Sequence, residues 1–277
     1  MDTGSLCCLQ KTCKCCDLSM GVATVDLMIG GKVFLVTGGT KGLGLAAARV
    51  LTAEGARVVV SSRTQEAVEK AVAELGGPDH AMGLVADNAD PEAADRLTAA
   101  ALRQYGRLDG ALISVGGPPT GPITAITDAQ WRESFESVFL GALRVARTAA
   151  PVLPTGGSIG FVLSLSVKAA WPNMSVSNGL RPGLAMAAKT LADELGPRGI
   201  RVNGFVVGSI ATDRLTQLEE ATGDPQQARI QRTADIPLRR YGTPEEFGRL
   251  AAVVLSPVAS YTTGSMIHID GGALRSL

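Results

Sequence analysis

Residues 32–44, KVFLVTGGTKGLG, contain the pattern that decides the fold of this chain. A short aliphatic run, Lys32 to Thr37, passes directly into a glycine-rich turn, and an Ala-rich helical stretch then runs from Gly42 to Glu54. A strand, a glycine-rich turn and a helix in this order predict a phosphate-binding site, because the first N–H groups of the helix point at the turn. The residues that we place in this site are Gly38, Thr40, Lys41, Gly42, Leu43 and Gly44.

Downstream of this unit, aliphatic runs alternate with helical patterns to the end of the chain. This alternation predicts an α/β fold with a doubly wound parallel sheet of seven strands and helices on both faces. One domain, residues 31–277, accounts for all of these elements. A polar stretch around residues 209–238 is predicted to be a flap over the site, with a plain surface insertion as the alternative. The predicted strands are Lys32–Thr37, Arg57–Ser61, Met82–Ala86, Leu108–Ser114, Ser158–Leu163, Ile200–Val207 and Met266–Ile269.

The composition excludes several classes of partner. The chain has 277 residues, with Lys plus Arg and Asp plus Glu balanced at 26 each, so it lacks the positive field that attracts nucleic acid or anionic lipid. Only 4% of the residues are aromatic, which leaves few rings for base stacking. No apolar stretch approaches the roughly 20 residues that cross a bilayer. We expect a cytoplasmic enzyme that acts on a small molecule, with no nucleic-acid or membrane partner.

All five cysteines lie in the first sixteen residues of the chain. They are Cys7, Cys8, Cys13, Cys15 and Cys16. A fold stapled by disulfides is therefore excluded, and no partnering Cys or His follows at zinc-ligand spacing, so we expect no metal site. Residues 1–30 are predicted to be a disordered extension, with Met20 as a possible alternative start.

The end of the second predicted strand indicates which dinucleotide the turn binds. An acidic residue about 20 residues beyond the glycine turn is typical of proteins that bind a free ribose 2′-hydroxyl. This chain has Ser61-Ser62-Arg63 at that place, and Arg63 can hold a 2′-phosphate bidentately while Ser62 donates a hydrogen bond. Lys41 adds a second positive charge. The sequence therefore favours NADP(H) over NAD(H); the alternative interpretation of Arg63 is a solvated residue that caps the next helix.

The motifs of the chain together resemble the short-chain dehydrogenase/reductase family, and the resemblance covers nearly everything from Lys32 to Leu277. It is carried by Thr37–Gly44, Asp87, Gly116-Gly117, Ile200-Arg201-Val202-Asn203, Tyr261-Thr262-Thr263-Gly264 and Asp270-Gly271-Gly272. The resemblance implies a Rossmann-type single domain and a homotetramer or dimer. It also implies that Asp87 lies near the adenine of the cofactor, that Ile210 and Thr212 lie near the nicotinamide carboxamide, and that Asn88 and Gly116 are further contacts.

The resemblance also shows where the chain departs from the family pattern. In that family a tyrosine passes a proton to or from the substrate oxygen, and a lysine four residues later lowers the pKa of the phenol and holds the nicotinamide ribose. Counting back from Lys189 places these positions at Ser177 and Arg181. A serine hydroxyl titrates far above the roughly 10 of tyrosine and arginine stays protonated above about 12, so neither relays protons near neutral pH. Arg181 can still donate to a ribose or polarise a carbonyl as a fixed charge.

Two further features bear on this part of the sequence. Pro182 directly follows Arg181 and predicts either a kink in this helix or a later helix start. The asparagine that anchors a proton-relay water in the family aligns here with Val138, and the usual asparagine after the fourth strand aligns with Ser114. The resemblance thus implies that the relay is missing along its whole length.

One family residue is retained, because Ser164 matches the serine that hydrogen-bonds the substrate oxygen, with Ser166 as a near alternative. Lys168 and Asn178 complete a polar group. A lysine in a poorly hydrated pocket can act as an acid or base, although an exposed loop lysine is the other interpretation. Asn178 can equally be a helix N-cap. The predicted apolar walls, which suit a hydrophobic carbonyl substrate, are Val115, Pro118, Pro119, Val138, Leu165, Trp171 and Met174.

Three functions remain open at this point. The first is an NADP(H)-dependent oxidoreductase that acts on a hydrophobic carbonyl or enone with a non-standard active site. The second is a non-redox cyclase, lyase or dehydratase on the same scaffold. The third is a catalytically silent cofactor-binding protein. Fold alone does not rank these functions. The family resemblance favours the first.

Overall fold

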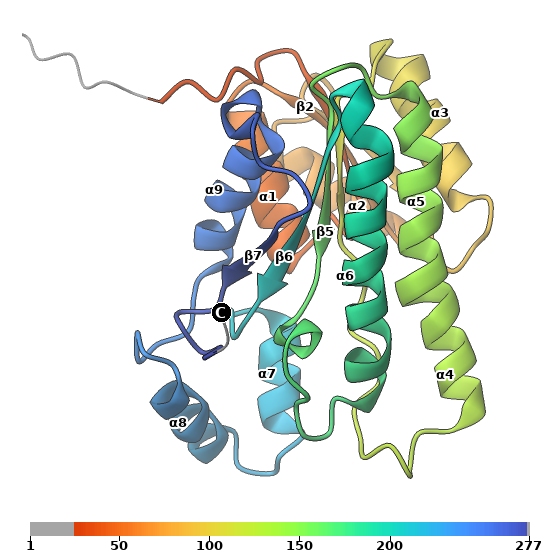
Figure 1. Cartoon of the computed structure of the whole chain (residues 1–277). Coiled ribbons are helices and arrows are strands. Elements are labelled where there is room, and N and C mark those ends of the chain that lie inside the picture. The colour runs from red at the N-terminus through yellow and green to blue at the C-terminus, as the bar shows by residue number, and fades with distance from the viewer. Residues whose placement is uncertain (1–24, 276–277) are drawn as a thin grey trace, which may run out of the picture.

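The computed structural model describes residues 25–275, and these form one sheet of seven parallel strands (Figure 1). The strand order is β3-β2-β1-β4-β5-β6-β7, so the chain winds outward in both directions from the pair β1 and β4. The predicted fold class is confirmed. The strands are β1 (Val33–Val36), β2 (Arg57–Ser62), β3 (Ala81–Val85), β4 (Gly110–Ile113), β5 (Ser158–Val162), β6 (Arg201–Val207) and β7 (Met266–Ile269).

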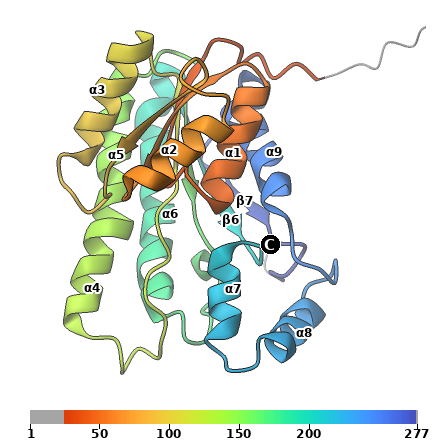
Figure 2. The ribbon, with the colours of Figure 1, turned by 180° about the vertical axis from the view of Figure 1, so that it is seen from behind.

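Helices cover both faces of the sheet, and Figures 1 and 2 show the two helical layers from opposite sides. Neighbouring residues of a strand point to opposite faces, so Phe34 packs in one core and Leu35 in the other. The helices on the Phe34 side are α1 (Gly42–Ala53), α2 (Gln65–Glu74) and α9 (Pro244–Leu255). Those on the Leu35 side include α3 (Ala93–Tyr105), α5 (Gly141–Ala149) and α6 (Ser175–Leu195).

The helix that precedes β5 is not regular along its length. The capping box predicted from its sequence is present, since Thr127 accepts from the backbone of Gln130 and Gln130 accepts from Thr127. From there α4 (Asp128–Ser134) continues into a π-helical segment, Phe135–Leu140, and then into α5. Val138 is buried inside the π-helical turns. Such π-helical insertions occur often at functional sites.

The predicted flap region contains two helices, α7 (Asp213–Glu220) and α8 (Pro225–Asp235), beyond the carboxyl end of the sheet (Figure 1). A small core of Leu215, Ile236 and Tyr241 holds them. The Tyr241 hydroxyl also donates to Glu219 at 2.5 Å, and burial followed by this bond raises the pKa of Tyr241 to about 12. The region is therefore packed by side chains of its own, and its movement over the site stays a prediction.

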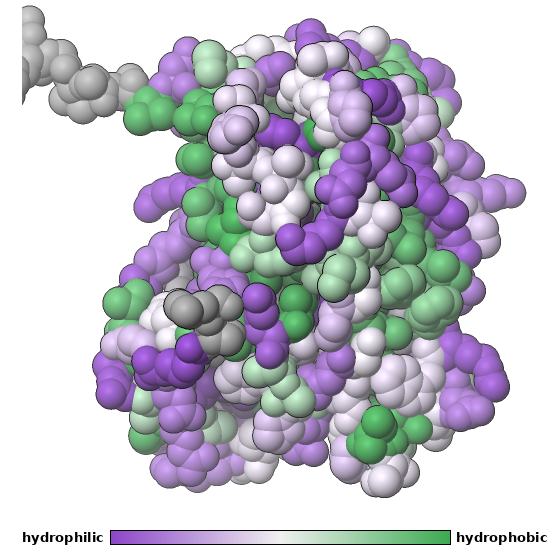
Figure 3. All heavy atoms as spheres, in the orientation of Figure 1, coloured by the Kyte–Doolittle hydropathy of each residue, from purple (hydrophilic) through white to green (hydrophobic). Residues whose placement is uncertain are grey.

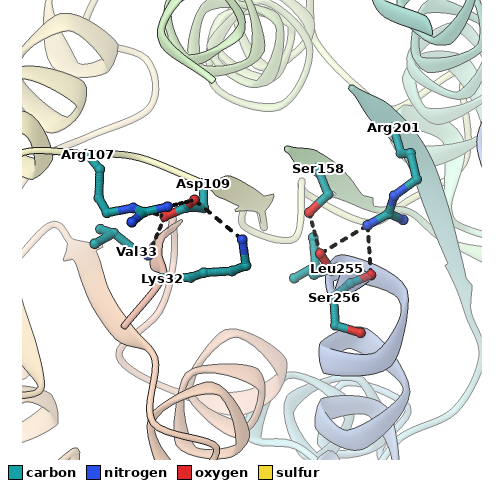
Figure 4. A network of polar contacts seen from close by, with 8 residues as sticks. All are labelled: Lys32, Val33, Arg107, Asp109, Ser158, Arg201, Leu255 and Ser256. Carbon is teal, nitrogen blue, oxygen red and sulfur yellow. Dashed lines mark hydrogen bonds and ion pairs between the residues drawn. The ribbon is translucent and has the colours of Figure 1, made fainter. Parts of the chain in front are cut away.

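The amino end of the sheet carries a polar network around two buried charges, Asp109 and Arg201 (Figure 4). Asp109 accepts two hydrogen bonds from Arg107, at 2.7 and 2.8 Å, and a third from the backbone of Val33 at 2.9 Å. Lys32 lies 3.7 Å from the same carboxylate. Across the sheet, the guanidinium of Arg201 donates to three carbonyl oxygens at the end of α9, at 2.6 to 3.1 Å. Every charge in this network has a partner of opposite sign or a row of acceptors.

The structure bears differently on the predicted extension, the membrane partner and the oligomer. The cysteines and most of the predicted extension, residues 1–24, lie outside the described residues. Within residues 25–275, no helix is long and apolar enough to cross a membrane. Figure 3 shows apolar residues among polar ones over α5 and α6, and the exposed apolar side chains of this layer include Phe135 and Met186. The predicted homotetramer or dimer stays a prediction.

Candidate active site

The glycine-rich turn lies between the carboxyl end of β1 and the start of α1. Gly44 packs directly on the turn, because a Cβ at this residue would lie 2.4 Å from the carbonyl oxygen of Gly38. Gly42 has a φ of +52°, a conformation that side chains rarely adopt. The start of α1 has no acidic residue in its first turn, and no side chain caps it at Lys41. Its orphan N–H groups therefore suit a phosphate, and the residues fit a dinucleotide.

The end of β2 lies beside this turn, since the backbone N–H of Gly39 donates to the carbonyl of Ser61 at 3.1 Å. Ser62 is the last residue of the strand and is half-buried, while Arg63 and Lys41 are exposed. A cationic side chain that follows β2 can reach a phosphate on the adenine ribose. The geometry is thus compatible with the predicted role of Arg63.

The other predicted cofactor contacts also lie at the carboxyl edge of the sheet. Asp87 and Asn88 follow β3, and Gly116 follows β4 with open space around it. Ile210 and Thr212 follow β6, and Thr212 faces the glycine turn, because a Cβ at Gly42 would lie 3.6 Å from the Thr212 methyl group. Parallel strands bring their carboxyl ends to one edge, where ligands of this fold bind.

Helix α6 places Ser177 and Arg181 on one buried face, four residues apart. The predicted later helix start is wrong, because α6 runs from Ser175 to Leu195 straight through Pro182. Proline has no backbone N–H, so the carbonyl of Asn178 lacks its usual helical donor. The proline changes the hydrogen bonding of this turn while the spacing of the two side chains is kept.

Ser177 is buried against the loop that follows β5. Its hydroxyl lies 2.9 Å from the hydroxyl of Ser166, which also contacts the Ser177 carbonyl at 3.3 Å. Both serines are almost fully buried, at 1% and 4% exposure. Ser164 is half-buried and accepts from the Ser166 backbone at 3.3 Å, so it is the serine of this group with access to solvent. Ser166 thus anchors Ser177, a contact that the sequence analysis did not assign.

Asn178 and Lys168 lie at the rim of this group. The Asn178 side chain forms two hydrogen bonds with the backbone of Trp171. It accepts from the N–H group at 3.2 Å and donates to the carbonyl at 2.9 Å. The alternative that Asn178 caps the helix is wrong, since Met174 occupies the N-cap position. Lys168 is exposed, and its side chain forms no hydrogen bond with the described residues. These contacts give Asn178 a loop-holding role and leave Lys168 facing solvent.

Arg181 has an unusual environment for a buried arginine. It is 7% exposed, and its one hydrogen bond within residues 25–275 goes from Nη1 to the carbonyl of Val162, at 2.7 Å. Burial, and secondly the nearby positive charge of Arg214, lower the pKa of Arg181 to about 10. The side chain therefore stays protonated at neutral pH, as the sequence analysis expected, with most of its N–H groups free to bind a ligand.

Arg214, the second residue of α7, is a site residue that the sequence analysis missed. Its guanidinium lies on Gly117, where a Cβ would be 2.5 Å from Nε, and Nη2 donates to the carbonyl of Pro118 at 2.8 Å. Burial lowers the pKa of this side chain as well. Its contact with Pro118, after β4, joins parts of the chain that are 96 residues apart, so no local pattern predicts it. The only signal in the sequence is that Arg214 lies two residues after Thr212.

Taken together, the fold and the site define a dinucleotide-binding protein of the doubly wound class. The sequence model of a family described as enoyl-(acyl carrier protein) reductase matches residues 38–273. A human protein named dehydrogenase/reductase SDR family member 4 is 32% identical over 250 residues, which are 88% of this chain and 88% of that protein. The chain therefore belongs to the short-chain dehydrogenase/reductase (SDR) family.

Other similar proteins support the same assignment. An uncharacterized oxidoreductase of Methylorubrum extorquens is 34% identical over 87% of this chain and 97% of its own length. The crystal structure of L-sorbose reductase from Gluconobacter frateurii, complexed with NADPH and L-sorbose, is 30% identical with a TM-score of 0.84, covering 91% of this chain and all of that one. A short-chain oxidoreductase of Pseudomonas aeruginosa, described as containing an atypical catalytic center, is 28% identical with a TM-score of 0.83, over 90% and 99% of the two chains.

Proposed function

We propose that this protein is an NADP(H)-dependent oxidoreductase that acts on a hydrophobic carbonyl or enone without the tyrosine and lysine pair of its family. The observation that carries the proposal is the uncapped start of α1 behind a tightly packed glycine turn, with Lys41 and Arg63 exposed beside it. The NADPH complex of the similar sorbose reductase is consistent with this cofactor. Localisation in the cytoplasm remains part of the proposal.

The bound nicotinamide supplies the hydride, and the residues of the chain bind and polarise the substrate. Ser164, the half-buried serine after β5, donates a hydrogen bond to the substrate oxygen. Arg181 holds a fixed positive charge next to that position, where it stabilises negative charge on an enolate or alkoxide and donates to the nicotinamide ribose. Because neither group releases a proton near neutral pH, the proton comes from water. A conjugate reduction, in which it ends on carbon, fits this site best.

The binding half of the proposal is tested by fluorescence titration with NADPH and NADH, using Trp131 and Trp171 as donors. Both tryptophans pack against α6. A Cβ at Gly179 would lie 2.8 Å from the ring of Trp131, and the backbone of Trp171 is hydrogen-bonded to the side chain of Asn178. We expect NADPH to bind at least about tenfold more tightly than NADH, a difference of about 1.4 kcal/mol. The variant R63S should lose this preference, since it removes the 2′-phosphate partner.

The control is R103S, which removes an exposed arginine of α3 and changes the net charge equally. It should keep the preference for NADPH. The chemical half of the proposal is tested by following NADPH oxidation with a panel of enones and ketones. Equal binding of the two cofactors, or the absence of binding, would contradict the proposed cofactor.

The burial of Ser177 against Ser166 supports a second candidate, because it withdraws the helical hydroxyl from any proton relay. In this alternative the protein is a non-redox cyclase, lyase or dehydratase, in which Ser164 and Arg181 polarise a carbonyl. Product formation without a change in the oxidation state of the cofactor would support it. Strict dependence on stoichiometric NADPH would exclude it.

A further inference from the structure

The carboxyl edge of the sheet contains two partly or fully buried cations without a counter-charge. Within the described residues, 25–275, neither Arg181 nor Arg214 forms an ion pair, and each donates one side-chain hydrogen bond, to the carbonyls of Val162 and Pro118 respectively. Val162 ends β5 and Pro118 follows β4, and these two strands are neighbours in the sheet, so both guanidiniums lie over the same part of its edge. Burying a charge without a partner is costly, so the almost fully buried Arg181 lowers the stability of the fold.

A third buried arginine shows what a purely structural arginine looks like in the same molecule. Arg201 is 5% exposed, and its guanidinium donates to three carbonyl oxygens, those of Val254, Leu255 and Ser256. Arg181 has five N–H donors, and one of them is hydrogen-bonded within the described residues, to the carbonyl of Val162. The free donors of Arg181 and Arg214 are therefore available to a ligand that brings several acceptors.

The position of the pair separates it from the phosphate turn. Arg214 lies on Gly117 and Pro118, which follow β4, and Arg181 is bonded to the last residue of β5. The phosphate turn instead follows β1, at Gly38 to Gly44. The two guanidiniums thus lie on the side of the edge where the resemblance places the nicotinamide and the reacting end of the substrate.

We infer that Arg181 and Arg214 form a subsite for an anionic group on the substrate, so that this enzyme acts on a carbonyl compound that carries a carboxylate. This inference rests on the proposed function and narrows its substrate class. Two guanidiniums recognise a carboxylate through charge-assisted hydrogen bonds, which are about twice as strong as neutral ones. The apolar residues that the sequence predicts as walls of the site, such as Val115 and Leu165, would bind the rest of the substrate, so we expect the ligand to be an amphipathic oxo acid.

The test compares 2-oxo-4-phenylbutanoate with its uncharged ethyl ester, by quenching of the fluorescence of Trp131 and Trp171. The titrations use the full chain, both without cofactor and saturated with NADP⁺. We expect the acid to bind at least about tenfold more tightly than the ester in the NADP⁺-saturated protein. The variant R214Q should lose about tenfold in affinity for the acid and much less for the ester, and R214K should restore part of the loss.

Two further variants sharpen the result. G117A adds a methyl group where the Arg214 guanidinium lies, so it displaces the charge without removing it and should lower the preference for the acid by a smaller factor. R103Q removes an exposed arginine of α3 and should leave the preference unchanged. An acid that binds no more tightly than the ester would overturn the inference.

The same titrations separate this inference from the proposed function. If R214Q weakens NADPH binding about tenfold while the ratio of acid to ester affinity stays unchanged, Arg214 serves the cofactor phosphates and the inference is wrong. If the protein binds no NADPH but still prefers the acid in its cofactor-free form, the proposed function is wrong and the anion subsite stands. If the acid preference persists in R214Q, Arg214 does not bind the carboxylate and the inference is wrong.

Discussion

The two ends of the sheet handle buried charge in opposite ways. At the amino end, Asp109 and Arg201 are almost fully buried, and each is held by several hydrogen bonds (Figure 4). At the carboxyl end, Arg181 is about as buried but donates only one hydrogen bond within residues 25–275, to the carbonyl of Val162. The charge that acts on its pKa is that of another arginine, Arg214. Charges with partners stabilise the fold at one end, whereas the charge of Arg181 at the other end has few partners, as is typical of binding sites.

Helix α9 runs between the two ends of the sheet, and side chains stabilise both of its own ends. Its carboxyl end meets Arg201, a cation placed where the helix dipole favours one. Its amino end has a capping box in which Thr243 and Glu246 satisfy each other's orphan N–H groups, and Arg240 pairs with Glu246 at 2.6 Å. Both ends of this helix are thus satisfied by side chains, so we expect α9 to be among the more stable elements.

The largest effect on stability is expected at the amino end, for D109A. The substitution removes a buried carboxylate that accepts from Arg107 and from the backbone of Val33, and leaves that N–H without an acceptor. We expect the free energy of unfolding to fall by about 3 kcal/mol, measured by urea denaturation. The exposed Asp79 provides the control, and D79A should change stability by less than about 0.5 kcal/mol. Equal effects of the two variants would show that the network does not stabilise the fold.

A matched pair of substitutions compares the two ends directly. R201M should lower the free energy of unfolding by about 2 kcal/mol, because it removes three hydrogen bonds at the end of α9 and leaves the carbonyl of Val254 without a donor. R181M should change it by less than about 1 kcal/mol, or raise it, since it removes a buried charge that lacks a counter-ion. Both are measured by urea denaturation. If R181M destabilises the protein as much as R201M, Arg181 is a structural residue and the contrast between the two ends fails.

The smallest effect concerns the pH dependence at the start of α9. The hydrogen bond from Arg240, followed by that from the Thr243 backbone, lowers the pKa of Glu246 to about 2 in the folded protein. Because the folded pKa lies below the unfolded one, this carboxylate stabilises the fold above the unfolded pKa and loses its contribution as the pH falls toward the folded pKa. The decrease in Tm caused by E246Q should therefore be larger at about pH 7 than at about pH 3. A decrease that is the same at both values would contradict this assignment.

How much of the site could be predicted depended on how far apart its residues lie along the chain. The structure of the glycine-rich turn was predictable, because strand, turn and helix are consecutive and each has a local signature, such as the glycine at residue 44. The spacing of Ser177 and Arg181 was left open by Pro182, since a proline inside a helix either breaks it or is tolerated according to tertiary packing. The pairing of Ser177 with Ser166 was not predictable, because it depends on how the loop after β5 meets the helix.

The sequence by itself determined the alternation of strands and helices, the order of the glycine turn and its helix, and the residue types available at the site. These follow from local preferences and from periodicity, which act over a few residues. Only the tertiary structure decided that Arg214 lies on Gly117, that Arg181 is buried with one acceptor, and that Lys168 faces solvent. The physical reason is that burial and electrostatic compensation depend on which distant segments meet in space, and a linear pattern of residues carries no direct record of those contacts.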